Sequence, residues 1–190
     1  MTLPTITKNQ TLDGVTYTHV SAHSEFPGTT GANEISGTRT AITPAAAVGG
    51  SRVVATGVNL TIPAGQTVRW LGLWEGSTFK RAIPSGGYTP RNFMSISASD
   101  VFYSEGHGYS DTQAIVFIDG VPPSPLAAGT IYYVRDADSN TFKAAATSGG
   151  AAINLIGTTS YACSVCRIAE YAYPTGGTHT VNTLTAIVPD

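Results

Sequence analysis

The sequence predicts an all-β protein, a β-sandwich with an inserted small β-barrel module. Short apolar runs and alternating runs recur along the chain, whereas helical periodicity is almost absent. Gly (21) and Pro (11) are frequent among the 190 residues, and turn signals recur about every 8–12 residues, as in sandwiches and barrels. Charged residues make up only 12% of the chain, against about a quarter in an ordinary soluble domain. Uncharged polar side chains are therefore expected to cover the surface.

The strongest expected core strand is 66–74, with the sequence QTVRWLGLW. Successive side chains point to opposite faces of a strand, so Trp70 and Trp74 share one face and Leu73 lies on the other. Apolar side chains on both faces indicate a central strand of a packed sandwich. We therefore expect Trp70, Leu73 and Trp74 to belong to the core.

The remaining expected strands are separated by loops rich in glycine and proline. They cover residues 15–22, 51–62, 114–118, 130–135, 140–146, 151–156 and 178–188. The composition changes near residue 100, and the next segment holds most of the turn residues. A unit of about 60 residues is near the lower size limit for independent folding. The prediction is an N-terminal arm (1–16), a sandwich (17–99 and 161–190) and an inserted barrel (100–160).

Charge and hydropathy exclude several classes of partner. The formal net charge is −2, which offers no electrostatic basis for binding nucleic acid or an anionic membrane. No apolar run approaches the ~18 residues that a membrane span needs, and the N-terminus lacks a basic region followed by an apolar one. We expect no nucleic-acid partner, no membrane insertion and no signal peptide.

Sequence motifs for catalysis are missing. The chain has no nucleophile elbow, no phosphate loop, no His-Glu-x-x-His and no dinucleotide glycine fingerprint. His107, Ser110 and Asp111 lie together in HGYSD, but a catalytic triad is assembled from distant segments, so a loop is the better interpretation. No catalytic residue and no cofactor is expected, and the chain is not expected to be an enzyme.

Two patterns resemble metal sites, but they lack the ligand distances or the ligand residues that a bound ion requires. His19 and His23 would share one face of a strand roughly 13 Å apart, at about 3.3 Å per residue, too far for one ion. The segment 136–140, DADSN, opens like a calcium loop, but Thr141 and Thr147 stand where glycine and glutamate are required. A hairpin turn explains DADSN better. No metal ligand is expected.

Cys163 and Cys166 form a Cys-x-x-Cys pattern in a strand-like segment, so their thiols would point to opposite faces. A zinc site would need two more ligands, and the chain has no second cysteine pair. Two buried thiols are the favoured interpretation, with a disulfide or a metal site as the alternative.

Four stretches taken together resemble the small tail-fibre or minor tail proteins of tailed bacteriophages, especially those that infect actinobacteria. They are THVSAHSEFPGTTGANEISGTRTAIT, GGSRVVATGVNLTIPAGQTVRWLGLWEG, the middle segment from EGHGYSD to GGAAINL, and AEYAYPTGGTHTVNTLTAIVPD. The middle segment is similar to a module found within phage structural proteins, although Thr112-Gln113 replaces its usual Gly-Asp. The resemblance covers roughly residues 17–190, and the first sixteen residues match nothing in the family.

The resemblance implies a non-enzymatic virion protein of the tail or tail fibre, made in the host cytoplasm and assembled as a symmetric oligomer. Its partners would be itself and other virion proteins. The first sixteen residues would form an extended arm that docks on a neighbour. The polar loop within 23–43 would pack against another subunit, although a simple exposed connection is the alternative. Its candidate contact residues are Glu25, Phe26, Asn33, Glu34 and Arg39.

Two alternatives stay open at this point. One is a capsid-surface decoration protein. The other is a recognition module that binds a host cell-wall glycan through exposed tyrosines, with Tyr88, Tyr103 and Tyr109 as the candidates and Tyr171 and Tyr173 in similar loop-like segments. Packing of these rings at strand ends is the competing interpretation.

Overall fold

A computed structural model of the chain describes residues 4–118, 120–157 and 160–187. The chain forms two compact units, one from residues 1–88 and 170–190 and the other from 89–169. Strands dominate both units, which confirms the predicted all-β class.

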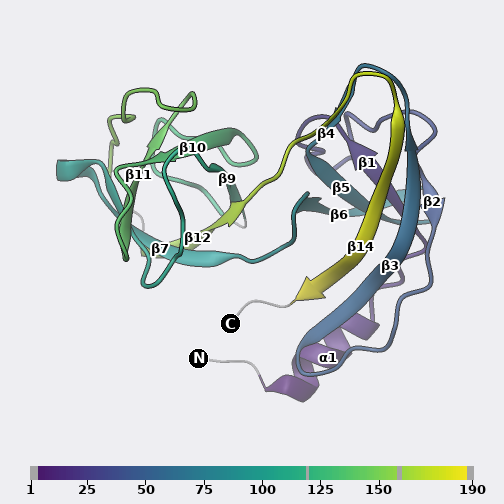
Figure 1. Cartoon of the computed structure of the whole chain (residues 1–190). Coiled ribbons are helices and arrows are strands. Elements are labelled where there is room, and N and C mark those ends of the chain that lie inside the picture. Colours follow the sequence, from purple (N-terminus) through teal and green to yellow (C-terminus); the bar gives the residue numbers. More distant parts are fainter. Residues whose placement is uncertain (1–3, 119, 158–159, 188–190) are drawn as a thin grey trace. The chain divides into compact units, whose positions relative to one another are not determined.

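The first unit contains a four-stranded antiparallel sheet (Figure 1). Its strand order is β2 (Thr40–Ala41), β1 (His19–His23), β5 (Trp70–Glu75) and β6 (Thr78–Pro84). β5 pairs with β1 on one side and β6 on the other, so it is central in this sheet. Trp70, Leu73 and Trp74 are all buried, as expected for a core strand.

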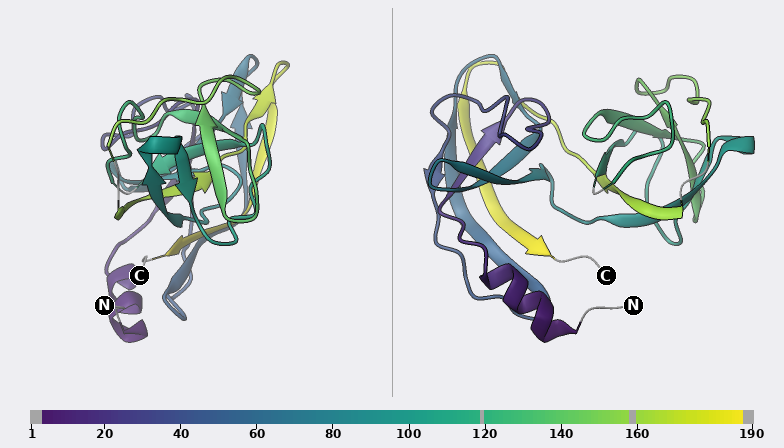
Figure 2. Two further views of the ribbon diagram at one scale, coloured as in Figure 1. Left: turned by 90° about the vertical axis from the view of Figure 1, so that its left-hand side faces the viewer. Right: turned by 180° about the vertical axis from the view of Figure 1, so that it is seen from behind.

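A long antiparallel ribbon of two strands lies against this sheet, in an arrangement like a β-sandwich. It consists of β3 (Ser51–Ile62) and β14 (Gly177–Ile187). Figure 2 shows the ribbon curving along the unit, from the turn that follows β3 to the region of helix α1. A second short pair, β4 (Gln66–Val68) and β13 (Tyr171–Tyr173), extends the same unit.

The prediction of an extended N-terminal arm is wrong, because residues Thr5–Asp13 form helix α1. Arg52 of β3 donates hydrogen bonds to the carbonyl oxygens of Leu12 and Val15, at 2.8 and 2.7 Å, and so satisfies acceptors at the end of the helix. The Asn9 side chain accepts the backbone N–H of Gly50 at 2.8 Å. The N-terminal segment therefore packs on its own unit.

The second unit is a closed six-stranded barrel in the order β10-β11-β8-β7-β12-β9. The strands are β7 (Arg91–Ile96), β8 (Val101–Tyr103), β9 (Ala114–Ile118), β10 (Ile131–Arg135), β11 (Thr141–Ala145) and β12 (Ser160–Arg167), and a 3-10 turn, Ser97–Ser99, joins β7 to β8. Phe102 packs against Phe93, Phe117 and Phe142, each with ring centroids 5.2 Å apart. These four rings, called here the phenylalanine cluster, form the aromatic part of the barrel core.

The boundaries of this unit differ from the predicted 100–160. The strands β7 and β12 pair with each other and close the barrel, so the unit runs from 89 to 169. Assigning 89–99 and 161–169 to the sandwich was therefore wrong. The strand predicted at 151–156 is also wrong, because that segment holds only isolated bridges from Ala152 and Ile156.

Candidate functional site

The polar loop that follows β1 lies on the tryptophan face of β5. The Phe26 ring packs on Trp70 with centroids 4.9 Å apart, and the Arg39 guanidinium lies 3.5 Å from the centroid of the Trp74 ring. Gly31 comes so close to Trp74 that a Cβ atom at this position would lie 2.3 Å from the indole. Residues 24–39 therefore cover part of the core.

The five candidate contact residues of this loop have partners in their own chain. Glu25 pairs with Arg69 at 2.6 Å, and Glu34 pairs with Arg39. The Asn33 side chain donates to the carbonyl oxygen of Phe26 at 3.0 Å. Glu25, Asn33 and Arg39 also remain exposed on the outer side. A subunit contact at this loop stays a prediction.

A buried chain of hydrogen bonds links the sheet to the loop. The Trp74 indole donates to Ser21 Oγ at 2.7 Å, Ser21 Oγ lies 2.8 Å from His23 Nε2, and His23 Nδ1 lies 2.8 Å from the carbonyl oxygen of Ala32. A carbonyl oxygen only accepts, so Nδ1 carries the proton and Nε2 accepts from Ser21. His23 is fully buried, and burial lowers its pKa. This Ser–His pair is sealed in the core and serves the fold.

The other sequence patterns have structural roles. Cys163 and Cys166 are buried and form no disulfide. Asp138 accepts the backbone N–H groups of Asn140 and Thr141, both at 2.7 Å, so DADSN forms the hairpin turn between β10 and β11. Within the described residues, no three side chains are grouped as a metal site would require.

The histidines and the HGYSD segment are likewise held by local hydrogen bonds. His19 Nδ1 lies 2.8 Å from the Thr18 hydroxyl. His107 Nδ1 accepts the backbone N–H of Tyr109 at 2.9 Å, and Asp111 accepts that of Ala137 at 2.9 Å. HGYSD is thus a structured loop of the barrel.

Two of the three candidate recognition tyrosines are not exposed, so that expectation was wrong for them. Tyr88 is 9% exposed and packs under the Arg81 guanidinium, and Tyr109 is 7% exposed. The Tyr109 hydroxyl donates to the carbonyl oxygen of Val165 at 3.2 Å, and burial raises the pKa of this phenol. Tyrosine is amphipathic, so its ring packs in a core once its hydroxyl has an acceptor. Tyr103 is 37% exposed beside a small pocket of the barrel.

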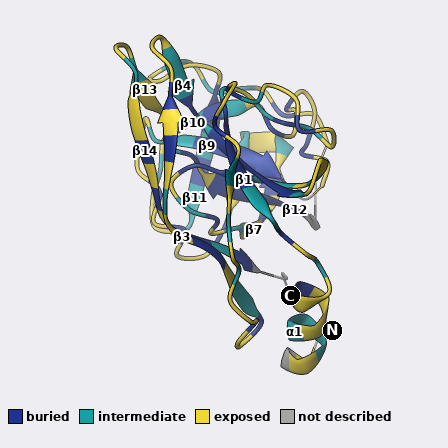
Figure 3. Ribbon diagram, turned by 90° about the vertical axis from the view of Figure 1, so that its right-hand side faces the viewer, coloured by how far each residue is buried: buried dark blue, intermediate teal, exposed yellow. Residues whose placement is uncertain are grey.

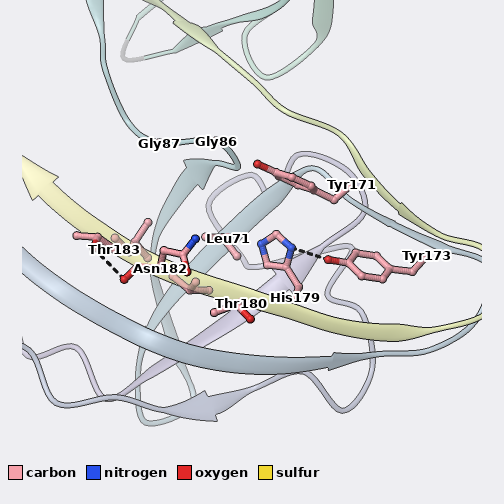
Figure 4. A pocket seen from close by; sticks show the side chains of 11 residues that line it. Leu71, Gly86, Gly87, Tyr171, Tyr173, His179, Thr180, Asn182 and Thr183 are labelled. Carbon is pink, nitrogen blue, oxygen red and sulfur yellow. Dashed lines mark hydrogen bonds between the residues drawn. The ribbon is translucent and has the colours of Figure 1, made fainter.

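A pocket of the first unit is called here the tyrosine–histidine pocket (Figure 4). Its volume is ≈ 370 Å³. Its eleven lining residues come from β5, the turn after β6, β13 and β14. They are Leu71, Gly86, Gly87, Tyr171, Tyr173, His179, Thr180, Val181, Asn182, Thr183 and Leu184.

His179 organises the aromatic end of this pocket. Its Nδ1 atom lies 2.9 Å from the Tyr173 hydroxyl, and its ring meets the Tyr171 ring edge to face with centroids 5.0 Å apart. His179 is 7% exposed, whereas Tyr171 is 42% exposed. Burial lowers the pKa of His179, so the imidazole is neutral at pH 7. The sequence pattern placed both tyrosines in loop-like segments, but it gave no sign that His179 joins them.

The outer face of the ribbon is the second prominent surface of this unit. Cross-strand pairs of hydroxyl and amide side chains run along it, from Thr61 with Thr178 to Asn59 with Thr180. Thr180 donates to the Asn59 side chain at 2.8 Å. Figure 3 shows exposed positions alternating with buried ones along β14. Within the described chain, β3 and β14 are the only strands of their sheet.

Comparison with family models, with curated proteins and with solved structures finds no match to this chain. In the described part of the chain, no helix has the length and apolar character needed to cross a membrane.

Proposed function

We propose that this chain is a non-enzymatic structural protein of a tailed-bacteriophage virion, a tail or tail-fibre subunit that assembles as a symmetric oligomer. The sequence resemblance motivates the proposal. The observation that carries it is the β3–β14 ribbon, whose strands of 12 and 11 residues pair only with each other in the described structure. The N-terminal end of β3 is engaged, since the Val53 carbonyl oxygen accepts the backbone N–H of Ala45 at 2.9 Å. Beyond Val53, β3 keeps an edge that a further strand could join, and β14 does so as well.

The composition of the ribbon supports association between copies. Monomeric proteins protect edge strands with charged residues or proline. The stretch Val54–Ile62 of β3 has neither, and β14 has no Asp, Glu, Lys, Arg or Pro. A two-stranded hairpin is also marginally stable without further packing. A second copy that adds its ribbon to this edge would satisfy backbone groups on both partners.

The outer face of the ribbon suits a repeated contact. Its threonine and asparagine side chains offer hydrogen-bond donors and acceptors without charge repulsion between identical copies. Interfaces of this kind are hydrogen-bonded and hold water, and closed symmetry repeats each contact. This contact takes the place of the one expected from an extended N-terminal arm, because residues Thr5–Asp13 form a helix that packs on its own unit. The polar loop remains a further candidate contact.

Sedimentation velocity on wild type and on three matched threonine-to-lysine variants tests the assembly. Thr61 lies on the ribbon, Thr29 in the polar loop and Thr147 in the barrel, and all three are exposed. Thr61→Lys should dissociate the oligomer, because like charges would face each other across symmetric ribbons, while Thr147→Lys should leave it intact. Dissociation by Thr29→Lys alone would move the contact to the loop. A monomeric wild type would contradict the proposal.

Labelling of particles tests the virion role. An antibody raised against the chain and coupled to gold is imaged on phage particles that carry its gene. Label on the tail or fibres would support the proposal. Label over the head would favour the alternative, a capsid-surface decoration protein. Intact and disrupted particles that both lack label would contradict a virion role.

A further inference from the structure

We propose that the tyrosine–histidine pocket binds a neutral saccharide, seating one uncharged pyranose ring against Tyr171. This inference concerns a ligand site and does not depend on the proposed assembly function. It rests on the aromatic wall of the pocket, on its uncharged polar groups and on its size.

The Tyr171 ring provides the flat apolar surface of the site. It is 42% exposed, and the edge-to-face contact with His179 fixes its orientation. Its backbone is held in the β13–β4 pair, opposite Val68. A tyrosine fixed in this way loses little conformational entropy on binding. The C–H groups on one face of a pyranose match such a ring, whose face is electron-rich.

The polar groups opposite this ring suit hydroxyl groups. Figure 4 shows Asn182 and His179 on the same stretch of β14, with the second ring nitrogen of His179 turned away from Tyr173. His179 Nδ1 is engaged with Tyr173, which leaves Nε2 for a ligand, as donor or acceptor according to the tautomer. The Asn182 amide offers one acceptor and two donors. Neighbouring hydroxyls of a sugar both donate and accept, so this combination complements them.

The charge of the lining selects against ionic ligands. None of the eleven lining residues is Asp, Glu, Lys or Arg. His179, the only titratable group of the pocket that changes charge near neutral pH, is held neutral by burial. A phosphate or carboxylate would therefore enter without a cationic partner and lose its hydration. A neutral polyhydroxyl ligand has no such penalty.

The dimensions agree with a small ligand. The volume of ≈ 370 Å³ lies at the lower end of the range of about 300–1,000 Å³ for small-molecule sites. The turn at Gly86 and Gly87 forms part of the wall without side chains, so backbone lies close to the ligand space. The site is thus suited to one ring of a longer glycan.

Saturation-transfer NMR on the intact chain tests this inference. The probes are glucose, galactose, mannose and N-acetylglucosamine, with glucuronate and glucosamine as charged comparators. We expect transfer to at least one neutral sugar and weaker transfer to its charged counterpart. Absence of transfer to every neutral sugar, and to neutral oligosaccharides built from them, would overturn the inference. So would binding of the charged sugars alone.

Three variants locate the binding. Tyr171→Ala should weaken the apparent affinity roughly tenfold or more, as expected for loss of an aromatic contact. Tyr171→Phe should keep it, because the ring face is unchanged, and Tyr103→Ala is the matched control on an exposed tyrosine of the barrel. Asn182→Ala should weaken binding without altering the aromatic wall. Unchanged affinity in both Tyr171→Ala and Asn182→Ala would overturn the assignment of the site.

Thermal unfolding of each variant separates lost binding from lost folding, since Tyr171 and Asn182 are both exposed. The assembly proposal has a different readout. Sedimentation of Tyr171→Ala should match wild type, so a failure of sugar binding and a failure of oligomerisation are distinguishable.

Discussion

His23 Nδ1 lies 2.8 Å from the carbonyl oxygen of Ala32, so a fully buried imidazole in β1 holds the polar loop onto the sheet. The same ring is joined through Ser21 to the indole of Trp74. Loop and sheet therefore share one buried network, in which the Trp74 indole nitrogen, the Ser21 hydroxyl and both ring nitrogens of His23 all have partners. Low dielectric makes such a network strong when complete and costly when one member changes.

This network predicts that stability falls in mild acid. Burial lowers the pKa of His23 below its ordinary value of 6.5. At higher pH the His23 imidazole is therefore neutral in both the folded and the unfolded chain. As the pH drops through 6.5, the unfolded chain binds a proton first, and folding loses up to about 1.4 kcal/mol per pH unit for each such histidine. The loss stops below the folded pKa. Urea unfolding between about pH 7.5 and about pH 5 measures the slope.

Substitution assigns that slope to particular histidines. His23→Gln should be less stable at neutral pH, by about 1–3 kcal/mol for a buried hydrogen bond left incomplete. It should also flatten the pH dependence. Burial also lowers the pKa of His179, so His179→Gln should remove a further part of the pH dependence of stability. An unchanged slope in the double variant would show that the histidines do not cause it.

Gly31 is expected to be irreplaceable, unlike Gly28 in the same loop. Both have positive φ, 78° and 61°, but an added Cβ at Gly31 would lie 2.3 Å from the Trp74 ring, whereas Gly28 has nothing within 4 Å. Gly28→Ala should cost about 1–2 kcal/mol for the left-handed backbone. Gly31→Ala should cost about 1–3 kcal/mol more, from overpacking. Denaturant unfolding of the two variants compares them, and equal losses would contradict the close packing.

Arg39 is expected to keep water from Trp74. Its guanidinium stacks on the ring at 3.5 Å from the centroid and pairs with Glu34. Arg39→Ala should lower stability by about 0.5–1 kcal/mol and shift tryptophan emission to longer wavelength. Glu34→Gln is the control, since it removes the ion pair but leaves the stacked cation. Identical spectra for wild type and Arg39→Ala would show that the stack does not form in solution.

The phenylalanine cluster should set the stability of the barrel. Phe117 is fully buried and packs against Phe93 and Phe102, so Phe117→Ala should cost about 3–5 kcal/mol. Tyr103→Ala, at an exposed ring of the same barrel, should stay within about 0.5 kcal/mol of wild type. Unfolding followed by near-ultraviolet circular dichroism measures both. Comparable losses in the two variants would contradict the assigned core.

Local patterns in the sequence were sufficient for the class of fold and for several elements. Alternation in QTVRWLGLW placed Trp70 and Leu73 on opposite faces of a buried strand, and both are buried. The DADSN turn followed from side chains that bond to the backbone two or three residues ahead. These features depend on neighbours in the chain, so periodicity and turn chemistry reveal them.

Long-range pairing decided the rest. β7 and β12 close the barrel although about seventy residues separate them, and alternation alone does not say which strand will be a partner. The tyrosine–histidine pocket likewise combines Leu71, Gly86 and the stretch 179–184. The burial of Tyr109 required an acceptor at Val165. Sequence alone determined which residues alternate and turn, while tertiary structure decided which segments meet, because contacts between distant segments leave no local period.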